Sequence, residues 1–426
     1  MKLISAAATS GSAVTSEQAR ALIAQACPAQ DYRGKKVLLI VPDATRTAPV
    51  GLMFKSLHEQ IGGVTKHLDI LVALGTHQPM SDAQICQRLE ITVAERRDAY
   101  GSVRFFNHAW NNPDALRRIG VIPADEIHAL SGGRFAMDVP VDINKLVFDY
   151  DQIIIIGPVF PHEVVGFSGG NKYLFPGVGG AEILNFFHWL GAVVTNPMII
   201  GNKWTPVRKV VDRAGAMVNV PKLCVAMVVQ GHDLVGLHIG SPEGAWDVAS
   251  DQSAQVNIIY KDRPFHTILS CAAPMYDEIW TAGKAMYKLE PVLADGGELI
   301  IYAPHVTEIC VAHGQYLREV GYHCSDYFVK QWDRFQHYPW GVLAHSSHVR
   351  GIGTFENGVE QCRAQVTLAT GISPEVCQQI NLGYRDPASL NPADYANREA
   401  EGVLLVPKAG EMLFHLKQRP AWATGS

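Results

Sequence analysis

The sequence predicts an α/β protein of two α/β domains, each with a mainly parallel sheet, and with an active-site cleft between the domains. The chain has 426 residues, and single hydrophobic cores stop growing at roughly 250–300 residues. Its 47% hydrophobic and 18% charged residues are typical of a globular protein. Short β-branched runs alternate with longer segments of helical period, which is the pattern of a parallel sheet covered by helices.

The first domain is expected to span residues 1–262, and its first three quarters carry three strand-then-helix pairs. Each expected strand is a short apolar run, and each expected helix has the periodicity of one buried face. The expected strands cover 35–43, 67–77 and 151–162, and the helices that follow them cover 50–63, 81–100 and 181–194.

The second domain is expected to span residues 263–401. The join near residue 262 is short and not rich in Ser or Pro, which favours a hinge or tight packing over a free linker. Residues 402–426, which begin with "GVLLVPKAGEMLFHL", are expected to form a strand and then a helix and to return to the first domain. Within the second domain, strands are expected over 266–271, 298–304 and 364–371, and helices over 276–297, 307–321 and 373–383.

Charge, hydropathy and cysteine usage narrow the class of function. A net charge of −5 without a basic stripe argues against nucleic acid as a partner. No apolar run reaches the ~18 residues of a membrane span, and the first twenty residues lack the apolar core of a signal peptide. The eight cysteines are scattered without a CxxC pair, so their spacing excludes a zinc ribbon and favours reduced thiols. We therefore expect a soluble cytoplasmic protein.

Three polar residues follow the expected strands of the first domain, namely Asp43, His77 and His162. Open α/β sheets bind ligands at the carboxyl ends of their strands. Asp43 with Arg46 in "PDATRTAP" suits either a helix cap beside a surface arginine or a grip on a carboxylate or phosphate. Two strand-end histidines are compatible with structural roles, with metal binding, or with a general acid and base on opposite sides of a stereocentre.

The stretch "FPHEVVGFSGGNKYLFPGVGGAEILNFFHWLGA", residues 160–192, places a lysine between two glycine-rich turns. Small residues such as Gly169 and Gly170 would let backbone N–H groups approach an anion, although the stretch is neither GxGxxG nor a Walker A sequence. Lys172 suits either a surface turn or a desolvated, nucleophilic amine. His188 lies on an apolar helix, where it suits a buried histidine with a backbone partner or a metal ligand.

These residues resemble the nickel-dependent lactate racemase family, whose members use a nickel-pincer nucleotide. The family's strand-end D-x-T-R turn corresponds to Asp43-Ala44-Thr45-Arg46, and its G-x-H-x-P segment corresponds to Gly75-Thr76-His77-Gln78-Pro79. Its long "H…GFSGG-x-K…FPG…H" block corresponds to residues 162–188, with the lysine ten residues after the first histidine and sixteen before the second. The resemblance covers both expected domains.

The resemblance implies a racemase or epimerase, that is, an isomerase of 2-hydroxy acids. It implies that Lys172 anchors the nucleotide, a pyridinium-3-thioamide-5-thiocarboxylate mononucleotide, and that His188 is a nickel ligand. His77 and His162 would be the two acid/base residues, and Arg46 would bind the substrate carboxylate. Asp43 and Thr45 would hold the cofactor or orient a histidine, and Gly169 and Gly170 would leave room for the nucleotide. Other proteins would synthesise and load this cofactor.

The chemistry of the substrate agrees with such a cofactor. The C2 hydrogen of an unactivated 2-hydroxy acid is a very weak acid, so removal of a proton by an imidazole is implausible. Removal of a hydride is easier, because loss of the hydroxyl proton to a histidine leaves a stable ketone. Return of the hydride to the other face of the planar keto acid inverts the centre, with the second histidine handling the hydroxyl proton.

One departure from the family concerns the substrate. Many members carry Gln-x-x-Lys where this chain reads Thr281-Ala282-Gly283-Lys284, so Lys284 is kept as a site residue and a shorter polar group replaces the amide. The smaller side chain could enlarge the pocket for a longer or polyhydroxylated 2-hydroxy acid. Residues 337–358 form either a structured loop or further contacts to substrate hydroxyls, through His345, Ser346, His348 and Arg350.

Two other classes of function remain open on the sequence. A metal-dependent hydrolase would use His77, His162 and Asp43 as zinc ligands and would have no use for Lys172 or a nucleotide. A non-catalytic carrier of nickel or nucleotide would share the scaffold without turnover.

Overall fold

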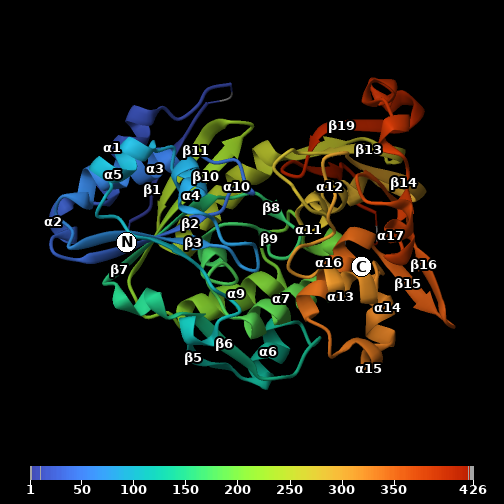
Figure 1. The fold of residues 1–426 in the computed structure, drawn as a ribbon, viewed down its shortest axis with the longest axis horizontal. Helices are drawn as coiled ribbons and strands as arrows, with labels where there is room; N and C mark the ends of the chain where they lie inside the picture. Colours follow the sequence, from blue (N-terminus) through green and yellow to red (C-terminus); the bar gives the residue numbers. More distant parts are fainter. Residues whose placement is uncertain (1, 10, 421, 423–426) are drawn as a thin grey trace. The chain divides into compact units, whose positions relative to one another are not determined.

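A computed structural model describes residues 2–9, 11–420 and 422 of the chain. The chain folds into two compact units, both of mixed α/β type, which confirms the predicted fold class (Figure 1). Unit 1 comprises Met1–Phe160, Phe167–Leu184 and Arg208–Val256, and unit 2 comprises Pro161–Gly166, Asn185–Val207 and Asn257–Ser426. The units are therefore interleaved along the chain, whereas the sequence suggested a join near residue 262 and a return to the first domain from residue 402.

Unit 1 is built on a seven-stranded sheet in the order β1-β11-β10-β7-β2-β3-β4. Its strands are β1 (Ile4–Ala7), β2 (Lys36–Pro42), β3 (His67–Ala73), β4 (Phe105–Asn107), β7 (Gln152–Pro158), β10 (Lys222–Gln230) and β11 (Asp233–Gly240). The five strands β10-β7-β2-β3-β4 are parallel, and β11 and β1 are antiparallel additions. A separate antiparallel pair consists of β5 (Leu116–Ile122) and β6 (Val139–Asn144).

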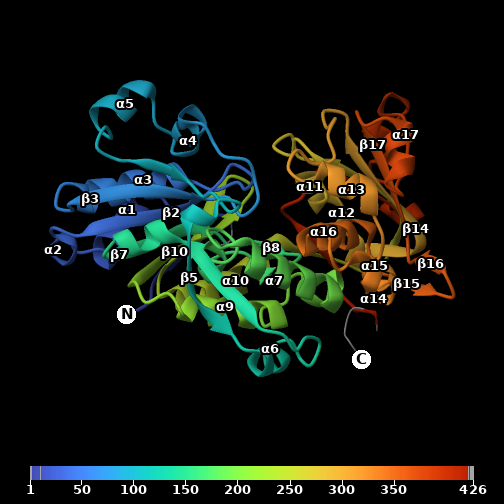
Figure 2. The same ribbon diagram turned by 60° about the horizontal axis from the view of Figure 1, so that its bottom comes forward.

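Helices cover both faces of the unit 1 sheet, because alternate residues of each strand point to opposite sides. Val37, Leu39 and Val41 of β2 share one core with Ala19 and Ile23 of α1, and with side chains of α3 and α4. On the other face, Gln252 of α10 accepts a hydrogen bond from His238 of β11. Figure 2 shows the ribbon of this unit from a second direction. The helices of unit 1 are α1 (Ser16–Ala26), α2 (Ala29–Tyr32), α3 (Val50–Leu57), α4 (Asp82–Arg88), α5 (Val93–Asp98), α6 (Ala124–Leu130) and α10 (Pro242–Asn257).

The helix predicted over 81–100 is two helices, α4 and α5. Glu90 has φ +56°, a left-handed conformation that ends a helix. The hydroxyl of Thr92 then accepts a hydrogen bond from the Glu95 N–H and begins α5 with a capping box. Local turn chemistry between the helices outweighed the continuous helical period of the segment.

Several elements lie where the chain passes between the units. They are β8 (Pro161–His162), β9 (Gly166–Phe167), α7 (Ala181–Val194), α8 (Asn196–Ile199) and α9 (Pro206–Ala216). The predicted helix over 181–194 corresponds to α7.

Unit 2 is built on a five-stranded, wholly parallel sheet in the order β18-β17-β14-β13-β19. The strands of this sheet are β13 (Phe265–Ala272), β14 (Leu293–Ala303), β17 (Gln365–Thr370), β18 (Gly383–Tyr384) and β19 (Val403–Ala409). Two separate pairs are β12 (Ile258–Lys261) with β20 (Leu413–Leu416), and β15 (Gly353–Glu356) with β16 (Val359–Cys362). Its helices are α11 (Ile279–Ala282), α12 (Lys284–Tyr287), α13 (Gly314–Val320), α14 (Ser325–Lys330), α15 (Trp332–Phe335), α16 (Trp340–Arg350) and α17 (Pro374–Gln379).

The end of the chain corrects two expectations. Val403–Ala409 forms β19 beside β13, so residues from 402 onward belong to unit 2 and do not return to the first unit. The segment that was expected to be a helix is β20, which pairs with β12. The backbone N–H and C=O groups of its "LFHL" run form hydrogen bonds in a two-stranded ladder with β12 instead. Residues 421 and 423–426 of the expected 402–426 segment lie outside the described residues.

Three further expectations in unit 2 need correction. The helix predicted over 276–297 consists of the short α11 and α12, and from Leu293 onward the chain is β14. The helix predicted over 307–321 is limited to α13. Residues 340–350, for which a structured loop was one expectation, form the buried helix α16. Among the residues that the structure describes, no helix is long and apolar enough to cross a membrane.

Candidate functional site

The candidate residues of unit 1 include a hydrogen-bonded Asp43–His77 pair. Asp43 follows β2 directly, and His77 lies four residues beyond the end of β3, the neighbouring parallel strand. The Nδ1 atom of His77 is 2.5 Å from Oδ2 of Asp43. Because the carboxylate accepts the Nδ1 proton, the neutral ring keeps Nε2 as its proton acceptor. This arrangement is that of an oriented general base.

Hydrogen bonds keep Asp43 ionised despite its burial. The side chain is 8% exposed, and burial alone raises the pKa of its carboxyl. The charge and hydrogen bond of His77, together with the Thr45 N–H at 3.0 Å and the Thr45 hydroxyl at 2.7 Å, lower the pKa well below its ordinary value. Thr45 therefore orients the carboxylate that orients His77.

Arg46 and Tyr173 complete this end of the sheet. Arg46 is partly buried, and its Nη1 donates to the Thr45 carbonyl at 3.1 Å. Burial raises the pKa of Tyr173. The charge of Arg46 opposes this rise, and the charge of Asp43 adds to it. Gly157 makes room for this ring, since a Cβ at position 157 would lie 2.2 Å from Cζ of Tyr173.

The glycine turn of residues 167–170 is held by its carbonyl groups. The fully buried Arg208 donates to the carbonyls of Phe167 at 2.5 Å and Gly169 at 3.4 Å. The indole of Trp246 donates to the Ser168 carbonyl at 3.0 Å and lies 4.0 Å below the Arg208 guanidinium. Burial lowers the pKa of Arg208 to about 10, so the group stays charged at neutral pH. A guanidinium that donates to two carbonyls fixes the path of this turn.

Packing accounts for both glycines of the turn. Gly169 has φ +91° and Gly170 has φ +59°, a region that L side chains rarely adopt. A Cβ at Gly169 would lie 2.6 Å from Cγ2 of Val159, and one at Gly170 would lie 3.0 Å from the Trp246 side chain. The Gly170 N–H also bonds to the thiol of Cys224. This N–H is thus used inside the fold, and the role of the two glycines in binding a nucleotide remains a prediction.

Lys172 lies on the short 3-10 turn Gly170–Tyr173 and is partly buried. Its neighbour Asn171 is buried and donates to Asp212 and Glu243, which anchors the turn. The Gly75 N–H donates to the Gly177 carbonyl at 3.0 Å. This bond ties the loop that carries His77 to the block that carries Lys172.

His162 belongs to unit 2 and lies four residues beyond the end of β7. Its side chain is buried, and its Nδ1 accepts a hydrogen bond from the Val164 N–H at 3.1 Å. The Glu163 carboxylate is 3.3 Å from the same nitrogen. The Val164 contact favours the ring with its proton on Nε2. The Glu163 contact becomes favourable when Nδ1 carries a proton, as it does in the imidazolium and in the other neutral tautomer.

His188 and Lys284 lie in the same unit as a group of buried histidines. His188 is half-buried on α7, and its ring stacks on Phe187 at 5.2 Å. Burial lowers the pKa of His345, and the charges of His348, His313, His188 and Lys284 lower it further. The Lys284 amine lies 4.6 Å from the ring centre of Tyr276. The unit therefore places neutral imidazoles and the buried Lys284 near one another.

The residues of α16 that were predicted to contact substrate hydroxyls have partners inside the fold. Nε2 of His345 is 3.2 Å from the Tyr322 hydroxyl, and its ring lies 4.3 Å from that of Trp280. The Ser346 hydroxyl donates to the Gly321 carbonyl at 2.8 Å. Packing therefore accounts for these two side chains, and their contact with substrate remains a prediction.

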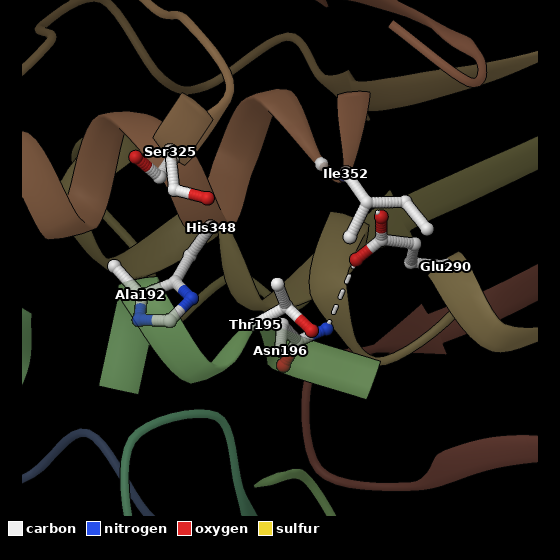
Figure 3. A pocket seen from close by; sticks show the side chains of 9 residues that line it. Ala192, Thr195, Asn196, Glu290, Ser325, His348 and Ile352 are labelled. Atoms are coloured by element: carbon white, nitrogen blue, oxygen red, sulfur yellow. Dashed lines mark hydrogen bonds between the residues drawn. The ribbon is translucent and has the colours of Figure 1, made fainter. Parts of the chain in front are cut away.

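A small cavity of about 10 Å³ lies beside His348 (Figure 3). Nδ2 of Asn196 donates to Glu290 at 3.1 Å. The opposite wall is His348, and burial lowers the pKa of this histidine to about 4 against a weaker raising effect of Glu163. Nε2 of His348 and Oδ1 of Asn196 have no hydrogen-bond partner among the described residues. Thr195 has φ +81°, an uncommon conformation for a β-branched residue. The cavity suits a small hydrogen-bonding molecule such as water.

The structure brings some predicted site residues together and leaves others untested. Unit 1 contains Asp43, Thr45, Arg46, His77, Gly169, Gly170 and Lys172, whereas unit 2 contains His162, His188 and Lys284. A cleft lined by all of them remains a prediction. The sequence analysis missed Glu163, Tyr173 and Arg208. The adjacent "HE" of "FPHEVV" was the one visible signal for Glu163.

Comparison with known proteins identifies a matching family model and two curated relatives of this chain. Residues 19–198 match the family model described as the lactate racemase N-terminal domain. Two curated relatives are named lactate racemase. The one from Thermoanaerobacterium thermosaccharolyticum is 24% identical over 277 residues, and the one from Lactiplantibacillus plantarum is 24% identical over 279 residues. These alignments cover 63% and 64% of this chain, and 60% and 61% of the length of the two relatives.

Two solved structures share the fold over nearly the whole chain. A protein of Thermotoga maritima is 33% identical, with a TM-score of 0.87, over 95% of this chain and 98% of that one. The lactate racemase apoprotein from T. thermosaccharolyticum is 17% identical, with a TM-score of 0.69, over 93% of each chain. The second likeness concerns the fold alone.

The fold and the site define an α/β protein of two interleaved units, with an oriented histidine and an arginine at the strand ends of a parallel sheet. Its family model, its curated relatives and the fold it shares identify this class further. The chain belongs to the lactate racemase family.

Proposed function

We propose that the protein is an isomerase that inverts C2 of a 2-hydroxy acid, either lactate or a longer or polyhydroxylated analogue. The observation that carries this proposal is the Asp43–His77 pair, 2.5 Å apart at the end of a parallel strand and three residues from Arg46. An oriented base next to a guanidinium suits a substrate with a hydroxyl beside a carboxylate. Family membership supports the same reaction.

The donor groups of the chain fit a nickel-pincer nucleotide. Lys172 is a partly buried amine on a turn held rigid by Arg208 and Asn171, which suits a covalent tether. His188 offers an imidazole on a helix, which suits a nickel ligand. When bound, the nucleotide would accept the C2 hydride of the substrate and return it. Loading would require cofactor-synthesis proteins as partners.

Arg46 would bind the substrate carboxylate through its planar guanidinium and so place the hydroxyl for proton transfer. His77 would take the hydroxyl proton at Nε2, because Asp43 holds the Nδ1 proton in place. The ionised Asp43 would also stabilise the imidazolium that results, as in other carboxylate–histidine pairs. Thr45 would orient Asp43 for this role through its two hydrogen bonds to the carboxylate.

His162 would serve as the second acid and base, with Glu163 in the role that Asp43 has for His77. A base at Nε2 needs its other proton on Nδ1, and Glu163 is the acceptor within 3.3 Å of that atom. The Val164 N–H competes for the same nitrogen, so the two histidines are not equivalent in their resting tautomers. This difference predicts different pH dependence for the two directions of the reaction.

We base the proposed substrate class on the charge of Lys284 and on the short side chain of Thr281. Lys284 is 5% exposed and would supply a positive charge to the substrate pocket. The Thr281 hydroxyl donates to the Glu278 carbonyl at 3.1 Å, so this position contributes little polar surface. A pocket with a short side chain here would accept a 2-hydroxy acid larger than lactate.

The test uses enantiomers and the two single variants His77→Ala and His162→Ala in the loaded protein. Each variant should lose overall interconversion by roughly 10²–10⁴-fold, which is typical of general acid–base catalysis. Each should still oxidise the one enantiomer whose proton acceptor it retains, as followed by the cofactor absorbance in stopped flow. Two variants with the same enantiomer preference would overturn the two-base assignment.

Intact mass and chirality separate this function from the other two classes. A covalent adduct on the Lys172 peptide that disappears in Lys172→Ala agrees with a racemase or a carrier and contradicts a zinc hydrolase. Loss of optical activity in a 2-hydroxy acid then distinguishes the racemase from the carrier. In His188→Ala, the nucleotide should remain attached while the nickel content falls. Unchanged nickel content would remove His188 from the ligand set.

A further inference from the structure

A cluster of two thiols and one carboxylate lies in unit 2, outside the residues proposed for catalysis. Cys324 immediately precedes α14, and Glu360 and Cys362 lie on β16. Glu360 and Cys362 are two residues apart on a strand, so both side chains point to the same face, toward Cys324. The two Sγ atoms and a carboxylate oxygen all lie within 4.8 Å of one another. Cys324 is fully buried, and the other two are half-buried.

The carboxylate of this cluster is held in place and ionised. Nδ2 of Asn381 donates to Oε2 at 3.5 Å. Two shorter hydrogen bonds come from the Cys324 N–H, 2.7 Å from Oε1, and from Nδ1 of His323, 2.7 Å from Oε2. Burial raises the pKa of Glu360, but these hydrogen bonds and the charge of His323 lower it to about 2. The side chain therefore keeps its negative charge at neutral pH.

The two thiols are close enough to interact directly. The hydrogen bond that Cys324 donates to Cys362 lowers the pKa of Cys362, against burial, and the charge of Arg350 lowers it further. A neighbouring carboxylate opposes the loss of a proton from either thiol, because like charges repel. The geometry carries the inference: two thiol sulfurs and one carboxylate oxygen converge on one point, which is the arrangement of a partial metal-ligand set.

We propose that Cys324, Glu360 and Cys362 bind one zinc ion. Thiolate sulfur and carboxylate oxygen are both zinc ligands, and two soft thiolates favour zinc over magnesium or calcium. On binding, Zn²⁺ replaces the protons of the two thiols, which are released to solvent, and the carboxylate loses none. The resulting centre has a net charge of −1, and a water molecule completes four-coordination.

The ion would fasten the β15–β16 hairpin to the start of α14. A two-stranded hairpin alone is marginally stable in water. The hairpin already contacts α14 through the Phe355 N–H, which donates to Asp326 at 2.6 Å, and through the Lys330–Glu356 ion pair at 2.5 Å. Glu360 adds the hydrogen bond from the Cys324 N–H, and zinc would add a further attachment through Cys362, at the open end of the hairpin. Because zinc binds the folded cluster only, it stabilises unit 2 by mass action.

The experiment uses full-length protein made without cofactor-loading partners, reduced, stripped of metal and titrated with Zn²⁺ alone. We expect one zinc bound per chain and about two protons released per zinc at a pH where both thiols begin protonated. Co²⁺ as a probe should give a near-ultraviolet thiolate-to-metal charge-transfer band, which histidine ligands do not produce. Zinc should also protect two cysteines from alkylation, and peptide mapping should identify them as Cys324 and Cys362.

Three single variants of the cluster and one control test the proposal, so poor folding of one variant does not prevent the test. Cys324→Ser, Cys362→Ser and Glu360→Gln should each weaken zinc binding by at least tenfold, whereas Cys271→Ser, at a half-buried cysteine of β13, should leave it unchanged. Far-ultraviolet circular dichroism checks the fold of each variant. His188→Ala should keep its zinc, so failure here is separate from failure of the proposed function. Zinc binding that survives in all three cluster variants, or a Cys324–Cys362 disulfide that forms in air while the reduced protein binds no zinc, would overturn the proposal.

Discussion

Acidification should destabilise unit 1 through His108, a histidine that is buried in its neutral form. The side chain is 2% exposed. Its Nε2 lies 2.9 Å from the Gly179 carbonyl and its Nδ1 lies 3.2 Å from Nδ2 of Asn144. The neutral ring with its proton on Nε2 satisfies both contacts. A second proton, on Nδ1, would face the amide donor of Asn144.

The size of the effect follows from the pKa. Burial lowers the pKa of His108 from 6.5 to about 4, and its hydrogen bond to Gly179 partly opposes this. Between these two values the unfolded chain binds the proton and the folded chain does not, so stability falls as the pH falls. Linkage gives a loss of about 2 kcal/mol in the free energy of unfolding between pH 8 and pH 5, from this residue alone.

Other buried histidines titrate over the same range, so the measurement is a difference between the parent and His108→Gln. Glutamine keeps one amide donor for Gly179 and one carbonyl acceptor for Asn144 but binds no proton in this range. Urea unfolding of both proteins at pH 8, 7, 6 and 5 should show a gap that closes or reverses by about 2 kcal/mol toward pH 5. His232→Gln, at an exposed histidine of the β10–β11 turn, is the control and should follow the parent. Parallel curves for the parent and His108→Gln would refute the reasoning.

Three further substitutions have defined outcomes. Asp43→Asn should lower kcat by roughly 10²–10⁴-fold with little change in KM, because an amide donor forces the proton of His77 onto Nε2; a large change in KM alone would contradict this role. Glu163→Gln should shift the acidic limb of the rate profile for one enantiomer to lower pH and leave the other enantiomer's profile unchanged, since it removes the charge that favours the adjacent imidazolium; equal shifts would contradict it. Gly157→Ala should destabilise the protein by about 1–3 kcal/mol in thermal unfolding, because its Cβ would overlap the Tyr173 ring; an unchanged Tm would show that the ring moves freely.

The strands and the strand-end residues were predictable because they depend on short-range patterns. Val37, Leu39 and Val41 alternate with equally buried neighbours in β2, and such a run ended by Asp43 signals a central parallel strand. His77 follows β3 in the same way. The Asp43–His77 contact was implied once both strands were placed in one parallel sheet, although the sequence alone did not give their order.

The remaining features depend on contacts between distant parts of the chain. Arg208 looks like a surface residue of an amphipathic helix, yet it is buried beneath carbonyl groups some forty positions earlier. The run "EMLFHL" has helical character, but its pairing with β12 decided its conformation. Cys324 and Cys362 are too far apart in sequence for a spacing motif, and the β15–β16 hairpin brings them together.

The interleaved order of the chain affects how the protein is made. Strand β7, with the run Ile153–Ile156, lies between β2 and β10 in the finished sheet, but β10 begins about 60 residues later. At a synthesis rate of roughly 5–20 residues per second, one edge of this uncharged, β-branched strand stays unpaired for about 3–12 s on the ribosome. Such an edge is a template for association with other chains. The nascent protein should therefore depend on chaperones most strongly while residues 159–221 are being synthesised, and slower translation of that segment should lower the soluble yield.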